Sequence, residues 1–544
     1  MITKMRILAA QINPTIGDLG GNTQKILAAL KRARQKKVDI VLFPEMTLSG
    51  YFPDDLLLDR AFIAAIEAQL EVIRPETKGL FVALGLPRPN PSGKEKPLLN
   101  SAAVFADGKQ LGFYDKALLP TYDVFDERRY FEPGHERPVW EYKGKRIGLT
   151  ICEDVWQHSG QLDGYVNYRI DPVIELKNKK PDLVLNLSAS PYYYKRADAR
   201  LSVFQKVAKT LHCPVVLCNQ VGANDQLIFD GHSLFVDAEG VLRQIAKGFA
   251  EDDLIVDLAE PCQACPVPAK GIPDLYAALV LGVRDYFHKQ GFKKGLVGLS
   301  GGVDSALVAC IGVEALGAEN MLAITMPSRY SSKGSVDDSH LLAKKLGLVL
   351  RDISIEPIYR EYLQLLEPLF AGRSPDETEE NMQTRIRGMI LMAFSNKFGS
   401  ILLNTSNKSE LAMGYSTLYG DMAGGLGVLQ DVTKMHVYQL AKYAGIPASI
   451  LQKVPSAELR ENQTDFDTLP RFEILDPILE DYLEERFTPE EIALRRKQPL
   501  ALVQQIVQTI HRAEYKRRQA PIGLRVTQKA FSKGRVVPIV QKWR

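Results

Sequence analysis

The sequence lacks the features that would place the protein in a membrane or outside the cell. Among its 544 residues no apolar run approaches the roughly 18 needed to cross a bilayer, and the best, Ala277–Val283, is far too short. The opening MITKMRILAAQINP has no small-residue cleavage site, which favours a first strand over a signal peptide. Six cysteines are too few for a disulfide framework in a chain this long. We therefore expect a soluble, cytoplasmic protein.

An excess of charge of one sign is also missing. Lys and Arg together number 68 and Asp and Glu 65, which excludes the global basic field that drives non-specific nucleic-acid binding. The most basic stretch, residues 514–544, is either a solvated tail or a clamp on an anionic substrate. Cys262 and Cys265 lack a second ligand pair at similar spacing, so we interpret them as two linker thiols and not a zinc site. We expect small-molecule substrates, with neither nucleic acid nor membrane as a partner.

Short β-branched runs alternate with helical patterns through the first half of the chain. Asn22–Lys36, for example, has its apolar residues at helical spacing. The runs expected to form buried strands are Arg6–Ala10, Ile40–Phe43, Phe81–Gly85, Arg146–Ile151, Leu183–Leu187 and Val215–Leu217. This alternation predicts a layered α/β domain over residues 1–257.

A second α/β domain is expected after a break in the pattern. Residues 258–272 are rich in Pro, Ala and Cys and predict a linker. Helices are then expected at Asp274–Lys289 and Val303–Leu316. The intervening and following strands are expected at Gly295–Leu299, Met321–Met326, Leu348–Asp352 and Ser400–Leu403. Repeated βα alternation predicts a doubly wound parallel sheet in residues 273–544.

The segment Gly295–Cys310 runs from an apolar strand through SGGVDS directly into a helix. Paired glycines allow a tight turn and close approach of the backbone to an anion, and the helix N-terminus supplies N–H donors and a positive dipole end. Asp304 would repel phosphate unless it holds a divalent cation, so the loop predicts Mg²⁺ bridging the phosphates of a nucleotide. The Walker pattern is absent, so γ-phosphoryl transfer of that type is not indicated.

The SGGxDS string of residues 300–305 resembles the PP-loop of the ATP pyrophosphatase superfamily, whose members adenylate a carboxylate or similar oxygen and release pyrophosphate. Six later segments resemble, in order and spacing, the synthetase domain of NAD synthetases: Asn381–Arg387, Asn404–Glu410, Gly414–Asp421, Asp431–Lys434, Pro455–Leu459 and Glu514–Arg518. The resemblance implies an adenine nucleotide alpha hydrolase-like fold with ATP, as co-substrate, on Gly298, Leu299, Ser300, Gly301, Gly302, Val303, Asp304, Ser305 and Thr405. It implies Mg²⁺ on Asp304 and Glu410, and deamido-NAD⁺ on Asn381, Arg385, Glu410, Lys434 and Lys516.

Three reactive groups lie at or near strand ends in the first domain. Glu45 follows the run VLFP, Lys116 lies in YDKALLP, and Cys152 ends the run GLTIC. A carboxylate, an amine and a thiol in such positions suggest one pocket. A lysine ammonium near the thiol would favour the thiolate, and a carboxylate nearby can shuttle its proton. The sequence therefore predicts a cysteine nucleophile with an acid–base partner.

This trio resembles the nitrilase, or carbon–nitrogen hydrolase, superfamily over about residues 4–257, which implies an αββα sandwich. In that resemblance Cys152 attacks an amide carbon, Glu45 is the general base and later the acid, and Lys116 stabilises the tetrahedral oxyanion. Glu127 is implied as the second carboxylate. The residues implied for glutamine binding are Tyr122, Ser190 and Arg196.

A nitrilase-like amidase followed by a PP-loop synthetase domain resembles the family of glutamine-dependent NAD⁺ synthetases over nearly the whole chain. The resemblance implies that ammonia from glutamine displaces AMP from adenylated deamido-NAD⁺. Because ammonia is mostly ammonium at neutral pH, we expect a dry passage between the two sites. A homo-oligomer is also implied. Two alternatives stay open: a PP-loop amidotransferase acting on another carboxylate or a purine, and a tRNA-modifying PP-loop protein with the basic C-terminal segment as its RNA surface.

Overall fold

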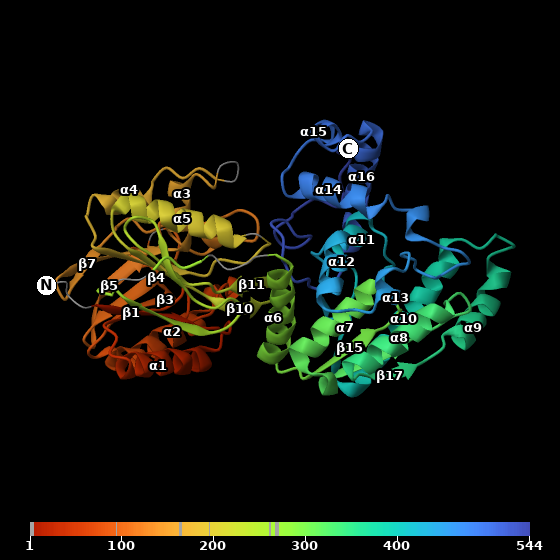
Figure 1. The fold of residues 1–544 in the computed structure, drawn as a ribbon, viewed down its shortest axis with the longest axis horizontal. Helices are drawn as coiled ribbons and strands as arrows, with labels where there is room; N and C mark the ends of the chain where they lie inside the picture. The colour runs from red at the N-terminus through yellow and green to blue at the C-terminus, as the bar shows by residue number, and fades with distance from the viewer. Residues whose placement is uncertain are drawn as a thin grey trace. The chain divides into compact units, whose positions relative to one another are not determined.

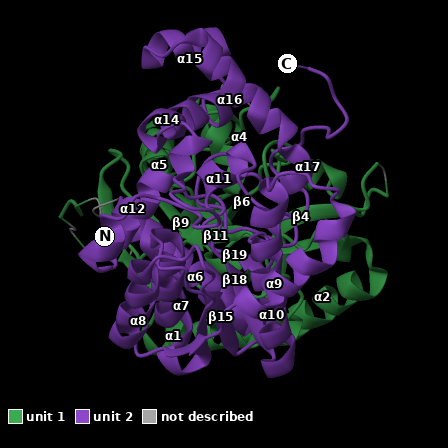
Figure 2. Cartoon of the chain, turned by 90° about the vertical axis from the view of Figure 1, so that its right-hand side faces the viewer, with its two compact units in different colours: residues 1–270 green, residues 271–544 purple. Residues whose placement is uncertain are grey.

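The computed structural model describes residues 5–93, 95–162, 166–194, 196–260, 263–266 and 271–543. The chain forms two compact units, residues 1–270 and 271–544 (Figures 1 and 2). Part of the expected linker, residues 261–262 with Cys262 and residues 267–270, lies outside the described residues. No helix within the described ranges is long and apolar enough to cross a membrane.

Two six-stranded sheets form the centre of the first unit. The first has the order β14-β1-β2-β3-β4-β5 and the second β13-β12-β9-β8-β7-β6, while β10 and β11 pair separately. The strands of the first sheet are β1 (Arg6–Gln11), β2 (Ile40–Leu42), β3 (Phe81–Pro89), β4 (Leu98–Ala106), β5 (Lys109–Asp115) and β14 (Asp252–Asp257). The others are β6 (Val139–Tyr142), β7 (Lys145–Ile151), β8 (Leu183–Ser188), β9 (Val215–Asn219), β10 (Val221–Asn224), β11 (Leu227–Asp230), β12 (Leu234–Val236) and β13 (Leu242–Ile245).

Helices cover the outer face of each sheet. Those on the first sheet are α1 (Leu19–Gln35) and α2 (Arg60–Ile73), and those on the second are α3 (Trp156–Ser159), α4 (Pro172–Lys177) and α5 (Arg196–Leu211) (Figure 1). The layers therefore run helix, sheet, sheet, helix, which confirms the predicted αββα sandwich.

Strand β1 shows why the buried strands are apolar throughout. Leu8 and Ala10 belong to the core under α1 and α2, whereas Ile7 and Ala9 belong to the core between the two sheets. Successive side chains of a strand point to opposite faces, and here both faces are covered. Strands of this kind carry no polar alternation, so only the length of the apolar run marks them in the sequence.

A five-stranded parallel sheet forms the centre of the second unit, in the order β17-β16-β15-β18-β19. Its strands are β15 (Lys294–Gly298), β16 (Met321–Thr325), β17 (Val349–Asp352), β18 (Ser400–Asn404) and β19 (Leu426–Gly427). Because β15 has β16 on one side and β18 on the other, the strand order reverses at its carboxyl end, where ligands of such sheets collect. The doubly wound parallel sheet is confirmed.

Helices pack on both faces of this sheet, with α6 and α7 on one side of β15 and α9 and α10 on the other (Figure 2). A C-terminal group formed by α14, α15 and α16 packs near α11. The helices of the unit are α6 (Ile272–Gln290), α7 (Val303–Leu316), α8 (Lys333–Leu346), α9 (Glu356–Leu366), α10 (Glu377–Phe398), α11 (Lys408–Met413), α12 (Lys434–Tyr443), α13 (Ala448–Leu451), α14 (Phe472–Leu483), α15 (Pro489–Arg496), α16 (Leu500–Arg512) and α17 (Glu514–Arg517).

Candidate active sites

Cys152 lies immediately after β7 in a turn that one carboxylate holds in shape. Its backbone has a φ of +41°, a left-handed conformation that is uncommon for a residue with a side chain. The Asp154 carboxylate accepts hydrogen bonds of 2.9 Å from the backbone N–H groups of Ile151, Ala117 and Leu118. Asp154 therefore ties the turn that carries Cys152 to the segment that follows Lys116.

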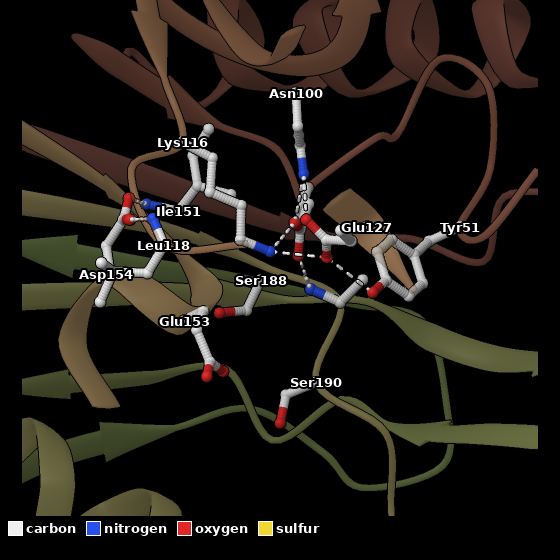
Figure 3. Close-up of polar contacts among 12 residues, drawn as sticks. Tyr51, Asn100, Lys116, Leu118, Glu127, Ile151, Glu153, Asp154, Ser188 and Ser190 are labelled. Atoms are coloured by element: carbon white, nitrogen blue, oxygen red, sulfur yellow. Dashed lines mark hydrogen bonds and ion pairs between the residues drawn. The ribbon is translucent and has the colours of Figure 1, made fainter. Parts of the chain in front are cut away.

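Lys116 joins two buried carboxylates. Its Nζ donates to Glu45 Oε1 and to Glu127 Oε1, both at 2.7 Å. Asn100 Nδ2 donates to Glu45 Oε1 at 2.7 Å and to Glu127 Oε2 at 3.3 Å, and the Tyr51 hydroxyl donates to Glu127 Oε1 at 2.9 Å. Figure 3 shows Lys116, Asn100 and Tyr51 pointing toward Glu127 from different parts of the chain. The three charged side chains are at most 1% exposed, so this is a buried charge cluster that is formed before any substrate binds.

Burial and mutual charge set the protonation of this cluster. Burial lowers the pKa of Lys116, but Glu127 and Glu45 raise it further, so that it stands well above its usual value. Burial raises the pKa of Glu127 to about 7 against the opposing charge of Lys116. Burial, with the charge of Glu45, also raises the pKa of the Cys152 thiol. The charge of Lys116 lowers the pKa of the thiol, as expected, but burial and Glu45 outweigh it. The thiol therefore needs a base, for which Glu45 is the candidate.

The residues expected to bind glutamine lie around the same turn. The Tyr122 hydroxyl donates to Glu153 Oε1 at 2.9 Å, and Glu153 follows Cys152 directly. The guanidinium of Arg196 lies 3.7 Å from the centroid of the Trp156 ring. Ser190 Oγ and Arg196 Nε are buried and have no hydrogen-bond partner among the described residues. Buried polar atoms without partners are rare and mark a place where a ligand can bind.

The PP-loop follows β15 and requires glycine at its second position. Gly301 has a φ of +77°, and a Cβ there would lie 2.3 Å from the backbone oxygen of Ser335. Ser300 Oγ accepts a hydrogen bond of 3.2 Å from Gly302 N, and α7 begins at the next residue, Val303. The free N–H groups at the start of α7 thus lie beside the loop, as an anion site requires.

A cavity of about 1230 Å³ opens beyond the carboxyl ends of the sheet. Of the residues expected at the ATP and deamido-NAD⁺ sites, those in its lining are Gly298, Leu299, Ser300, Gly302, Val303, Asp304, Ser305, Asn381, Thr405, Glu410, Lys434 and Lys516. Gly301 packs against Ser335 behind the loop. Arg385 is exposed outside the lining and donates to the backbone oxygen of Leu418 at 3.2 Å, whereas Arg387 lines the cavity. The geometry therefore favours Arg387 over Arg385 as a ligand contact.

Lys434 repeats in this cavity the arrangement around Lys116. Its Nζ donates to Asp304 Oδ2 at 2.6 Å and to Glu410 Oε1 at 3.2 Å. Burial raises the pKa of Glu410 to about 7 despite the charge of Lys434. No group of three or more potential metal ligands occurs in the part of the chain that the structure describes. Two carboxylates completed by phosphate oxygens are a common Mg²⁺ site, so Asp304 and Glu410 fit a metal that arrives with the nucleotide.

Several residues of both sites were not among the sequence expectations. Lys453 lines the cavity and its Nζ donates to Gly301 O at 3.1 Å, which places an ammonium beside the PP-loop. Asp465 also lines the cavity, and burial raises its pKa. Lys453 stands two residues before Pro455–Leu459, a segment that the sequence analysis assigned to the synthetase domain. The sequence therefore pointed to this region but not to Lys453 itself. No sequence pattern around Asn100 or Tyr51 indicated a role in the first site.

The fold and the two sites define a class of protein: an amidase with a buried glutamate–lysine–cysteine site, joined in one chain to a PP-loop domain that binds a nucleotide. The family model for carbon–nitrogen hydrolase matches residues 6–266, and the one for NAD synthase matches residues 275–520. A glutamine-dependent NAD(+) synthetase of Synechocystis sp. is 43% identical over 98% of both chains. One from Thermotoga maritima is 40% identical over 99% of both. The solved structure of the Acinetobacter baumannii enzyme in complex with adenosine diphosphate superposes with a TM-score of 0.77 at 37% identity, covering 100% of this chain and 99% of that chain. The chain belongs to the family of glutamine-dependent NAD⁺ synthetases.

Proposed function

We propose that the protein makes NAD⁺ from deamido-NAD⁺, ATP, glutamine and water, and releases AMP, pyrophosphate and glutamate. The observation that carries this proposal is the match along essentially the whole chain, at 43% and 40% identity, to enzymes named for glutamine-dependent NAD⁺ synthesis. Each unit adds a site suited to one half of the reaction. The first holds a thiol beside a buried base, and the second holds an anion-binding loop beside a large polar cavity.

In the first unit Glu45 takes the proton of the Cys152 thiol, and Sγ attacks the side-chain amide carbon of glutamine. The Lys116 ammonium stabilises the negative charge that develops on the amide oxygen. Glu45 then gives the proton to the leaving nitrogen, and ammonia departs. Water, deprotonated by the same carboxylate, cleaves the thioester and releases glutamate. Glu127 holds Lys116 charged and in place throughout, as its 2.7 Å hydrogen bond indicates.

Recognition of glutamine rests on the polar groups beside Cys152. Arg196, with its guanidinium stacked on Trp156, and the unpartnered hydroxyl of Ser190 suit the α-carboxylate of an amino acid. Tyr122 and Glu153 offer a hydroxyl and a carboxylate to its α-ammonium. A substrate without these two charged groups would lose most of its contacts.

In the second unit ATP binds with its phosphates on the PP-loop, beside Lys453 and Lys434, and its adenosine near Thr405. Asp304 and Glu410 would hold Mg²⁺, which neutralises the charge of the departing pyrophosphate. The pyridine carboxylate of deamido-NAD⁺ attacks the α-phosphorus, giving an acyl adenylate. Ammonia then attacks the acyl carbon and AMP leaves. The residues proposed to hold deamido-NAD⁺ in the cavity are Asn381, Arg387, Glu410, Lys434 and Lys516.

The remaining parts of the proposal concern setting and assembly. We infer a cytoplasmic enzyme of small-molecule substrates that works as a homo-oligomer and passes its ammonia directly between sites. Leu365, Leu369 and Met389, on α9 and α10 and at their junction, are 68 to 74% exposed, which suits a subunit interface. A fully active monomer in sedimentation experiments would contradict the inferred homo-oligomer. If added ammonium competes freely with ¹⁵N-amide glutamine as the source of the nitrogen in NAD⁺, the inferred direct transfer of ammonia is contradicted.

The reaction is tested by measuring AMP and NAD⁺ formed from deamido-NAD⁺, ATP and Mg²⁺ with glutamine or ammonium chloride. We expect both products in equal amounts with either nitrogen source. ATP-dependent consumption of glutamine without NAD⁺ would instead support an amidotransferase for another carboxylate. A salt-sensitive electrophoretic shift of tRNA, with no NAD⁺ formed, would support the tRNA-modifying alternative.

A further inference from the structure

Helix α11 carries one residue that lines the synthetase cavity and, two positions before it, one that is buried outside the cavity. Glu410, which faces Lys434, is the third residue of this six-residue helix, and Lys408 is the first. Lys408 is absent from the cavity lining and its side chain is 1% exposed. A buried ammonium outside the site is costly unless it is fully paired, so its partners reveal what it does.

Two of the four partners of Lys408 come from the C-terminal segment, residues 514–544. Its Nζ donates to Thr527 Oγ1 at 2.7 Å and to the backbone oxygen of Lys529 at 2.9 Å. Asp431 Oδ1 and Glu484 Oε1, both at 3.1 Å, complete the set. Four oxygens around one ammonium leave it no capacity for another ligand. Lys408 therefore joins α11 to the chain more than 100 residues further on.

Asp431 binds the same C-terminal segment as Lys408. Its Oδ2 accepts hydrogen bonds from the backbone N–H groups of Val526, at 2.8 Å, and Thr527, at 2.6 Å. Its Oδ1 accepts one from the Thr527 hydroxyl at 2.7 Å. Thr527 thus touches both ends of the buried Lys408–Asp431 pair, and its hydroxyl is the group that links them to the C-terminal segment.

The same segment also holds the other end of α11. The Arg517 guanidinium donates at 3.0 Å to the backbone oxygens of Leu411 and Ala412 in the last turn of the helix, where Leu411 O accepts only a longer hydrogen bond, of 3.3 Å, from Gly414 N. Arg517 in turn pairs with Glu514 at 2.9 Å. A helix of six residues has little stability of its own, so contacts at its two ends decide where its side chains stand.

Residues 408 to 410 therefore connect three parts of the unit. Lys408 reaches the C-terminal segment, Ser409 Oγ accepts a hydrogen bond of 3.0 Å from Lys434 N, and Glu410 reaches the Lys434 side chain. We propose that Lys408, with Thr527, is a positioning residue through which the C-terminal segment sets the place of Glu410 in the synthetase site. This inference assigns the basic C-terminal stretch an internal role, as a brace on α11, and it rests on the proposed function of that site.

The test compares Thr527→Val, which keeps the shape and removes the hydroxyl, with Thr527→Ser, which keeps the hydroxyl. Ser395→Ala is the matched control, because it removes one hydroxyl hydrogen bond, of 2.6 Å to Ser400 O, from a residue outside both the cavity lining and the contacts of Lys408. With ammonium as the nitrogen source, we expect Thr527→Val to raise the half-saturating Mg²⁺ concentration about tenfold. Lys408→Met should raise it about 100-fold. Thr527→Ser and Ser395→Ala should match the wild type.

A second readout does not depend on catalysis. Hydrogen–deuterium exchange of the amides of α11 in the full chain should be faster in Thr527→Val and Lys408→Met than in the two controls. Unchanged exchange together with an unchanged Mg²⁺ dependence in a folded Thr527→Val variant would overturn the inference, even if the melting temperature fell. Failure of the wild type to make NAD⁺ would overturn the proposed function alone, because the exchange comparison would still test the brace.

Discussion

The two sites share one ionic arrangement, a lysine between two carboxylates, and differ in how exposed those carboxylates are. In the first unit Lys116 lies between Glu45 and Glu127, and in the second Lys434 lies between Asp304 and Glu410. The carboxylates around Lys116 are 0% exposed, whereas those around Lys434 are each 18% exposed and face the cavity.

This difference matches what each site must do. A small neutral amide needs a charge array that is ready before it binds, so that little reorganisation is left for the reaction. A nucleotide brings its own negative charge and, in our proposal, its metal, so the second array must stay accessible. Before the nucleotide binds, Lys434 can serve as the common counter-ion of the two neighbouring carboxylates.

The largest effect should come from Lys116→Met. Two fully buried carboxylates would lose their common counter-ion and the reaction its oxyanion stabiliser, so glutamine-driven NAD⁺ formation should fall about 10³-fold. Ammonium-driven formation should stay within a factor of two or so of the wild type, since Lys116 belongs to the other unit. A comparable loss with both nitrogen sources would mean that the two sites are not separate.

The mirror variant is Lys434→Met, for which we expect a smaller loss. Because its carboxylates are partly solvated, ammonium-driven synthesis should fall about 10²-fold. Glutaminase activity, followed as glutamate release, should persist. A loss as large as that of Lys116→Met would contradict the view that the second array is the wetter and more adaptable one.

Gly301→Ala tests whether the PP-loop backbone is as constrained as its geometry indicates. A side chain at a φ of +77° whose Cβ falls 2.3 Å from Ser335 O must displace the loop. We expect the KM for ATP to rise about tenfold or more, with glutaminase activity unchanged. Gly20→Ala, at a site with no atom within 4 Å of the added Cβ, is the matched control and should leave both activities intact.

The smallest effect should be on the pH dependence of stability through Glu127→Gln. Burial raises the pKa of Glu127 to about 7, above its ordinary value of 4.5. A raised pKa gives stability that is complete below the unfolded value and lost as the pH rises through the folded one. Between pH 5 and 8 the wild type should therefore lose roughly 1–3 kcal/mol more of its free energy of unfolding than Glu127→Gln does.

Denaturant titrations followed by tryptophan fluorescence would measure this difference. Two of the three tryptophans, Trp140 and Trp156, lie in the first unit, so the signal reports mainly on the unit that contains Glu127. Parallel pH profiles for wild type and Glu127→Gln would contradict the raised pKa.

Much of the fold could be predicted because the buried strands are uninterrupted apolar runs. The expected strand Arg6–Ala10 is found as β1, Arg6–Gln11, and the expected helix Val303–Leu316 is α7 with the same bounds. The antiparallel strand β4 was not among the expectations, and with it Asn100 was missed, although it donates to both carboxylates of the first site. A lone Asn in an apolar run carries no sign of the partners that the fold brings to it.

Site residues could be placed on elements from the sequence, but their direction could not. Residues two positions apart in a helix lie on nearly opposite sides, so the sequence that named Arg385 in α10 could not favour it over Arg387, which lines the cavity. The protonation of Cys152 depends on burial and on the charge of Glu45, more than 100 positions away. Such quantities belong to the packed structure and become visible only there.

Separate sites in one chain are the central claim, and Cys152→Ala tests it most directly. NAD⁺ formation is measured for this variant and the wild type with deamido-NAD⁺, ATP and Mg²⁺, first with glutamine and then with ammonium chloride. We predict that the variant makes no NAD⁺ from glutamine above background and retains the wild-type rate with ammonium. Equal loss with both nitrogen sources, or glutamine-driven synthesis that survives the change, would contradict the account.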